Sequence, residues 1–142
     1  MPNWSKSFET YVQLSEKQRL NIGLKSNANL AKELENLSEE EMLRPTIYML
    51  SLAPFASTEE ELSKKEYLFI KDATGYADGY ERYLELVKKG QNEKLAQFFQ
   101  LYFKKVGGEV FTAYLSLALA ILTLKGEIKD EDVKLIEKIY ED

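Results

Sequence analysis

One apolar stretch, residues 110–124, constrains the fold of this chain more than any other part of the sequence. Its 15 residues carry no charged side chain, although Thr112, Ser116 and Thr123 are polar. The stretch is shorter than the roughly 20 residues that a helix needs to span a bilayer. A helix that is apolar on nearly all sides is normally buried by other helices. We therefore expect residues 110–124 to form the central helix of a helical domain.

The clearest helical periodicity lies between residues 63 and 89. Apolar side chains recur there at intervals of three and four, the pattern of a helix in a bundle; they are Ile70, Ala73, Ala77, Tyr80, Leu84 and Val87. Gly75 and Gly79 interrupt the pattern, and each weakens a helix by about 1 kcal/mol. Two interpretations remain open: close packing of the backbone against another element, or a real break at Asp78-Gly79.

Two further helices are predicted from capping and periodicity. Ser15 starts a helix that continues to about Asn36, and Gly23 and the asparagines that follow it indicate a break or kink near residues 25–29. Residues 92–106 form an amphipathic helix. Its predicted apolar face consists of Leu95, Phe98, Phe99, Tyr102, Phe103 and Val106.

Two more helix starts complete the fold prediction. Ser38 can form a capping box with Glu41, although Pro45 also permits a start one turn later, with the proline at the first helical position. Asp130 caps a C-terminal helix. No segment has the alternation of a strand. We therefore predict an all-α fold, with residues 1–142 forming one compact bundle of five to seven helices.

The chain contains neither cysteine nor histidine. Their absence excludes disulfides, thiolate nucleophiles, the usual general base and the commonest zinc ligand. Carboxylate pairs such as Asp72 with Asp78, or Glu81 with Glu85, remain as acid–base candidates. Placement at helix starts and pairing with nearby lysines explain these acids without any chemistry. We therefore predict a chain that is not an enzyme and has no cofactor.

Acidic residues near the C-terminus raise the question of a site for a hard cation. An EF-hand loop centred on Gly126 fails, because an isoleucine, a threonine and a lysine fall where oxygen ligands belong. A looser site of Glu127, Asp130 and Glu131 stays as an alternative. These acids also suit the N-terminus of a helix.

Net charge limits the partners that the whole molecule attracts. The charge is −5, with −2 on residues 1–71 and −3 on residues 72–142. This even balance gives no overall attraction to nucleic acid or to an anionic membrane, and the three arginines are few for recognition of bases or phosphates. The N-terminus lacks the apolar run of a secretory signal. We expect a cytoplasmic protein with no membrane association, and its composition is compatible with a thermophilic source.

Aromatic residues are interleaved with basic ones between residues 64 and 89. Tyr76, Tyr80 and Tyr83 are our candidates for a surface that binds a protein partner. The same segment can offer base-stacking platforms beside lysines. Tyrosines at helical spacing are more often half-buried, with the hydroxyl at the rim of the core.

The segment from Leu117 to Ile139 resembles the C-terminal signature of tellurite-resistance-B-like (TerB-like) domains. That signature is an apolar helix ending in Ala-Asp-Gly-Glu-Ile, then acidic residues and an amphipathic helix; here Lys125 replaces the aspartate. The resemblance implies a small all-helical acidic domain. It places Asp78, Glu127 and Glu131 nearest the family's acidic metal-associated motifs.

The segment from Glu66 to Lys89, with the aromatic pairs of residues 98–103, resembles the small helical subunit of type III CRISPR effector complexes. That family stacks along guide and target strands. The resemblance implies contacts to the nucleic-acid backbone from Lys71, Arg82, Lys88 and Lys89.

We favour a non-enzymatic interaction module that binds a protein partner, and homo-oligomers are compatible with it. The alternatives are a small subunit of a ribonucleoprotein and an acidic metal-associated domain.

Overall fold

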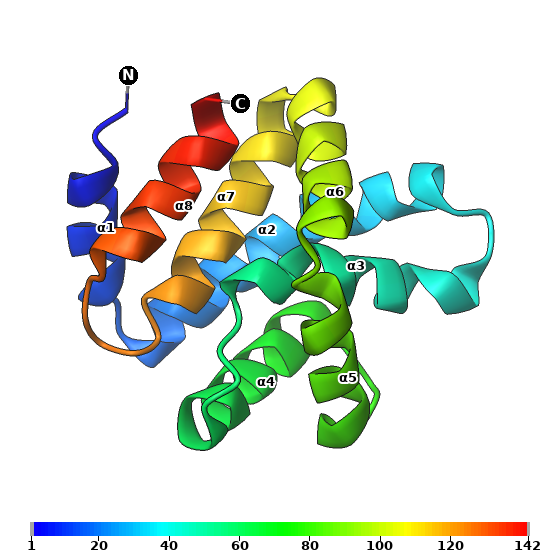
Figure 1. Ribbon diagram of the computed structural model, residues 1–142, viewed down its shortest axis with the longest axis horizontal. Coiled ribbons are helices and arrows are strands. Elements are labelled where there is room, and N and C mark those ends of the chain that lie inside the picture. The colour runs from blue at the N-terminus through cyan, green and yellow to red at the C-terminus, as the bar shows by residue number, and fades with distance from the viewer. Residues whose placement is uncertain (1, 142) are drawn as a thin grey trace.

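The computed structural model describes residues 2–141, and within that range the chain consists of helices and their connections, with no β-strand. Eight α-helices and two short 3₁₀ helices follow one another along these residues (Figure 1). The all-α prediction is confirmed. One more α-helix forms than the predicted five to seven, because the periodic region between residues 63 and 89 is divided in two.

The helices have the following bounds: α1 Trp4–Val12, α2 Glu16–Leu37, α3 Arg44–Leu52, α4 Glu60–Thr74, α5 Tyr80–Gly90, α6 Glu93–Val106, α7 Gly108–Leu122 and α8 Asp130–Glu141. The 3₁₀ helices are η1 Glu41–Leu43, which leads into α3, and η2 Ala53–Phe55, which follows it.

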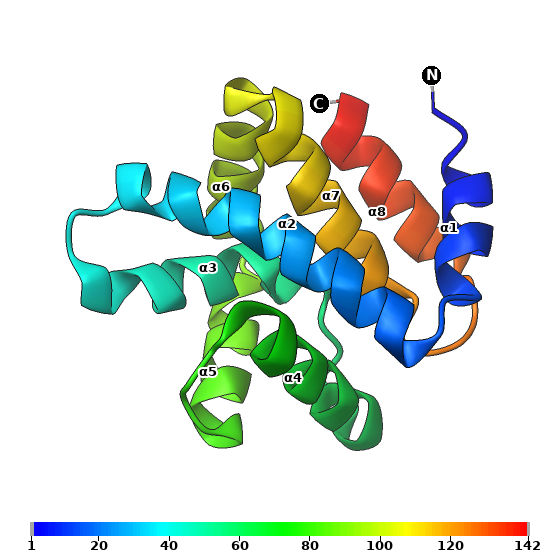
Figure 2. The same ribbon diagram turned by 180° about the vertical axis from the view of Figure 1, so that it is seen from behind.

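Helix α7 is the centre of the bundle, as its apolar sequence predicts. Every residue from 117 to 122 is buried. Figure 1 shows α7 between α6 and α8, with α2 crossing behind it, and Figure 2 shows the same crossing from the other side. No helix among residues 2–141 has the length and apolar character needed to cross a membrane.

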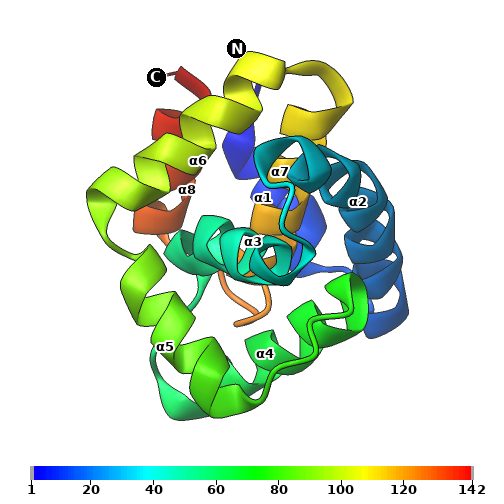
Figure 3. The same cartoon turned by 90° about the vertical axis from the view of Figure 1, so that its right-hand side faces the viewer.

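Helix α3 occupies a second central position. Viewed end-on in Figure 3, it is surrounded by α2, α4, α5 and α6. Helix α5 ends against α3 at Gly90, where a Cβ atom would lie only 2.5 Å from the Cβ of Ala53 and 2.7 Å from the carbonyl oxygen of Leu50. This glycine therefore permits a close approach between two helices as well as a helix end.

The predicted break near residues 25–29 is wrong. Helix α2 runs unbroken through this region. Gly23 instead faces α4, where a Cβ atom would lie 2.8 Å from the Cβ of Ala73 and 3.0 Å from Cζ of Phe69. The small residue serves close helix packing there, and the hydrogen-bonded ladder of a long helix outweighs the modest local cost of a glycine.

Gly75 has the opposite role. Its φ of 75° is left-handed, a conformation that suits glycine, and it ends α4 by donating its N–H to the carbonyl of Lys71 at 2.9 Å. Helix α5 begins only at Tyr80. Of the two interpretations of this region, the break is confirmed.

The helix starts follow the predicted signals only in part. Helix α8 begins at Asp130 itself, so this residue lies in the first turn and does not cap the helix as predicted. Ser15 forms a full capping box with Gln18. Ser38 does not form the predicted box, because its hydroxyl accepts from the N–H of Glu40 at 3.2 Å. Helix α3 begins at Arg44 with Pro45 in its first turn.

Candidate functional site

The three tyrosines predicted to bind a partner lie mainly inside the protein. Tyr83 is fully buried, Tyr76 is 6% exposed and Tyr80 is half-buried. The Tyr80 and Tyr83 rings stack with centroids 6.1 Å apart, and the Tyr80 hydroxyl donates to Oγ of Ser63 at 3.1 Å. The predicted tyrosine surface is therefore wrong for Tyr76 and Tyr83. Tyr76 lies in the α4–α5 connection and Tyr83 on the buried side of α5.

The predicted nucleic-acid residues are all exposed. Lys71 lies in the last turn of α4, whereas Arg82, Lys88 and Lys89 lie on α5. Arg82 pairs with Glu85 at 3.0 Å, which offsets part of its charge. Three of these basic residues lie on one helix, and this placement leaves the nucleic-acid alternative open. It does not by itself form a groove for a nucleic acid.

The predicted metal residues do not form a ligand set. Asp78 lies in the α4–α5 connection, whereas Glu127 lies in the α7–α8 connection and Asp130 and Glu131 in the first turn of α8. Figures 1 and 2 both place these two connections on opposite sides of the molecule. Across the described residues, no three histidine, cysteine, aspartate or glutamate side chains are grouped so as to hold a metal ion. Helix-start placement accounts for Asp130 and Glu131, whereas Glu127 lies 3.8 Å from Nζ of Lys129.

A buried polar cluster that the sequence did not reveal joins α4 to the α7–α8 connection. The Glu66 side chain, 1% exposed, accepts the backbone N–H of Ser57 at 2.7 Å. Nearby, Lys125 forms a largely buried ion pair with Asp132. These residues line a cavity of about 560 Å³. Glu66 precedes Ile70 by one helical turn and therefore lies on the same buried side of α4. This spacing is the feature of the sequence that could have predicted its burial.

Burial raises the pKa of Glu66 to about 7. The Ser57 N–H and the charge of Lys125 oppose this rise, whereas the charges of Asp132 and Glu59 reinforce it. The cluster can therefore take up one proton near neutral pH. Its remaining members are an ion pair and a backbone amide, and they influence Glu66 through their charges and one hydrogen bond.

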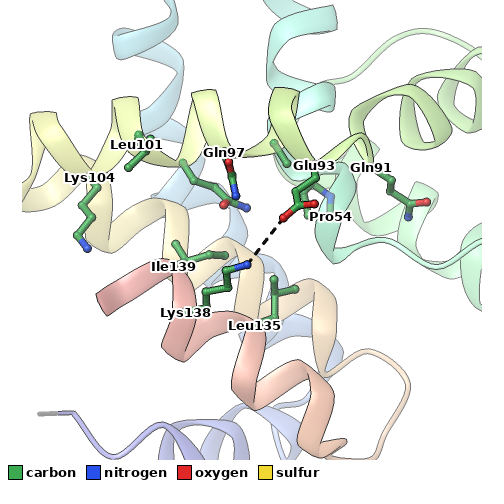
Figure 4. Close-up of a pocket in the computed structure, with 11 residues that line it drawn as sticks. Pro54, Gln91, Glu93, Gln97, Leu101, Lys104, Leu135, Lys138 and Ile139 are labelled. Carbon is green, nitrogen blue, oxygen red and sulfur yellow. Dashed lines mark ion pairs between the residues drawn. The ribbon is translucent and has the colours of Figure 1, made fainter. Parts of the chain in front are cut away.

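A groove with a mixed apolar and polar lining lies between α6 and α8 (Figure 4). It encloses about 440 Å³ and is lined by Pro54, Gln91, Glu93, Ala96, Gln97, Gln100, Leu101, Lys104, Leu135, Lys138 and Ile139. Leu101 comes from α6, and Leu135 and Ile139 come from α8. Across the groove, Nζ of Lys138 lies 4.0 Å from Oε1 of Glu93.

The outer side of α6 continues this apolar surface. Phe98 is 59% exposed and Leu101 is 55% exposed. Lys94 and Lys105 are exposed on the same side, each four residues from one of these apolar side chains. Helix α6 therefore buries one apolar side and exposes a second, smaller one.

This arrangement corrects the predicted face of α6. Phe99 and Phe103 are buried against the core, but Phe98 and Val106 are exposed. The sequence shows apolar residues at both i and i+1, and one helix side cannot bury both completely. That doubled pattern was the signal for a second apolar side.

Comparisons with known proteins found no relative of this chain. No protein-family model matches the chain, and no similar protein was found among curated proteins or among solved structures. The resemblances to tellurite-resistance-B-like domains and to CRISPR small subunits therefore rest on the sequence motifs alone.

Proposed function

We propose that this chain is a non-enzymatic, cytoplasmic interaction module whose α6–α8 groove receives an amphipathic helix of a protein partner. The observation that carries this proposal is the pair of large apolar side chains, Phe98 and Leu101, that α6 exposes beside the groove. Burial of each of them would contribute about 1.5–3 kcal/mol.

The shape of the groove suits a helix. Helix α6 has 14 residues and is about 21 Å long, enough to contact four turns of a partner helix. Helix-in-groove recognition uses apolar anchors at i, i+3, i+4 and i+7 on the partner. Leu101, Leu135 and Ile139 supply the apolar floor that such anchors need.

The charges around the groove favour an acidic partner, although the chain itself is acidic. Four lysines surround it, three on α6 and one on α8: Lys94, Lys104, Lys105 and Lys138. Glu93 is the one acid among the lining residues and already lies beside Lys138. An incoming helix with acidic residues flanking its apolar anchors would complement this rim and would be steered toward it.

The experiment compares two exposed leucines. Leu101 on α6 and Leu68 on α4 are both 55% exposed. Tagged wild-type protein, Leu101→Asp and Leu68→Asp are purified from the native host, with and without nuclease. We expect one stoichiometric protein with the wild type and with Leu68→Asp, and its loss with Leu101→Asp. Hydrogen exchange of the complex should show protection in α6 and α8.

Three outcomes would overturn the proposal. If Leu101→Asp retains the partner, the partner binds at another surface of the molecule. Nucleic acid that co-purifies and is lost as salt rises would favour the ribonucleoprotein alternative, and Lys88→Glu should then abolish it. A second copy of this chain as the sole associate would indicate a homo-oligomer. Within the proposed complex, Lys104→Glu should weaken binding chiefly by slowing association.

A further inference from the structure

A smaller pocket lies on the other side of α3, between α2, α3 and the end of α4. It encloses about 250 Å³, the volume of roughly eight water molecules at about 30 Å³ each. Apolar side chains from all three helices line it: Leu34, Met49, Leu52 and Ile70. A space of this size and lining suits a monocyclic organic molecule.

Three residues of the same pocket carry buried polar atoms that lack a partner. These atoms are Oδ1 of Asn27 and the hydroxyl oxygens of Tyr48 and Tyr76. The two tyrosine side chains are each more than nine-tenths buried. The residues described by the structure hold only two other such atoms, on Trp4 and Tyr83. The unpartnered atoms are thus concentrated around one pocket.

The contrast with Tyr114 shows that the fold can satisfy a buried tyrosine. Its hydroxyl donates to the backbone carbonyl of Ser51 at 2.7 Å. Burial raises the pKa of Tyr76 to about 12 and the neighbouring Asp78 carboxylate reinforces the rise, but no partner meets full hydrogen-bond geometry at the Tyr76 hydroxyl. Burial without a partner costs stability that a ligand can recover.

We infer that this pocket binds a small, neutral, mostly apolar molecule that carries one hydroxyl group. A hydroxyl both donates and accepts, so it can donate to Oδ1 of Asn27 and accept from a tyrosine. The charged residues that line the pocket are Glu35, Glu41 and Arg44, and Nε of Arg44 already donates to the carbonyl of Ser38 at 3.0 Å. This near balance of charge favours a neutral ligand.

The unpartnered atoms are themselves covered, with almost no surface open to solvent. A bound hydroxyl can therefore reach them only if these side chains shift toward the pocket. This inference is independent of the α6–α8 groove, because the two sites share no lining residue.

The test uses phenol and toluene, two probes of nearly equal size that differ in a hydroxyl and a methyl group. Each is titrated into the full chain while amide signals are followed by NMR. We expect phenol to shift signals in α2, α3 and the end of α4, and to bind several-fold more tightly than toluene. Tyr48→Phe and Tyr76→Phe should each weaken phenol about fivefold and leave toluene unchanged.

Tyr80→Phe is the matched control, because its hydroxyl already donates to Ser63 and it does not line this pocket. It should bind phenol like the wild type. Equal binding of phenol and toluene would overturn the inference, since the pocket would then be merely apolar. Absence of shifts in these three helices, or phenol binding that both phenylalanine variants retain, would overturn it as well.

Discussion

The guanidinium Nη1 of Arg19 lies 2.6 Å from the hydroxyl oxygen of Thr123, at the C-terminal end of α7. The same nitrogen donates to the carbonyl of Ala120 at 2.7 Å, and Nη2 donates to the carbonyl of Tyr11 at 2.8 Å. One buried side chain thus joins the ends of α1 and α7. The C-termini of helices carry partial negative charge, which suits a cation. Burial lowers the pKa of Arg19.

Replacement of Arg19 should therefore be among the costliest single changes. Arg19→Met keeps much of the apolar stem but removes the buried charged donor to the Ala120 carbonyl and the Thr123 hydroxyl, so we expect a loss of about 3 kcal/mol in the free energy of unfolding. Urea denaturation measures it. Lys17→Met, at an exposed position of the same helix, should change stability by less than about 0.5 kcal/mol. Equal effects of the two would contradict this role.

We expect that Gly90 cannot be replaced by a residue with a side chain, whereas Gly79 can. A Cβ atom at Gly90 would meet Ala53 at 2.5 Å, but at Gly79 no atom lies within 4 Å. Gly90→Ala should lower the free energy of unfolding by about 1–3 kcal/mol through overpacking. Gly79→Ala should stay within about 0.5 kcal/mol of the wild type. Thermal and urea denaturation of both variants provide the check, and a tolerated Gly90→Ala would refute the close contact between α5 and η2.

Glu66 should make stability depend on pH near neutrality. Burial raises its pKa from 4.5 to about 7. Between these values the folded state holds a proton that the unfolded state has lost, so the free energy of unfolding falls as pH rises from 4.5 to 7. The fall should amount to at most about 3 kcal/mol. The absence of histidine removes the commonest competing titration in this range.

Glu66→Gln isolates that contribution. Urea denaturation at pH 5 and pH 8 should show a smaller decline in the variant, which should exceed the wild type in stability at pH 8. The charges that face Glu66, those of Lys125, Asp132 and Glu59, stay in place in this variant. A decline of the same size in both proteins would assign the pH dependence to other groups.

Loss of the hydroxyl should affect stability differently at two buried tyrosines. Tyr114→Phe removes a hydrogen bond of 2.7 Å to Ser51 and should cost about 1 kcal/mol. Tyr48→Phe removes a hydroxyl that has no partner, so stability should stay equal or rise. Differential scanning calorimetry of the two variants without ligand distinguishes them. A loss at Tyr48 as large as that at Tyr114 would show that a water molecule already satisfies this hydroxyl.

The candidate groove was hidden from the sequence for a physical reason. Phe98 and Phe99 are adjacent apolar residues on one helix, and periodicity alone assigns both to the same face. The direction in which α7 packs decides that Phe99 is buried and Phe98 is not. Leu135 and Ile139 join the groove only because α8 lies beside α6. Periodicity likewise could not show that the tyrosines of the α4–α5 hairpin face each other.

Local sequence by itself determined which segments are helical, where most of them begin and which one is central. The Ser15 cap and the proline at the start of α3 act within a few residues, so their effects do not depend on the rest of the chain. The run of α7 is apolar on nearly all sides, so any compact packing of the helices buries it. Tertiary packing decided that Gly23 closes a contact between α2 and α4 instead of breaking α2. It also decided that Glu66 is buried and Phe98 exposed. These outcomes depend on which distant helix lies opposite, and that is a property of the assembled bundle.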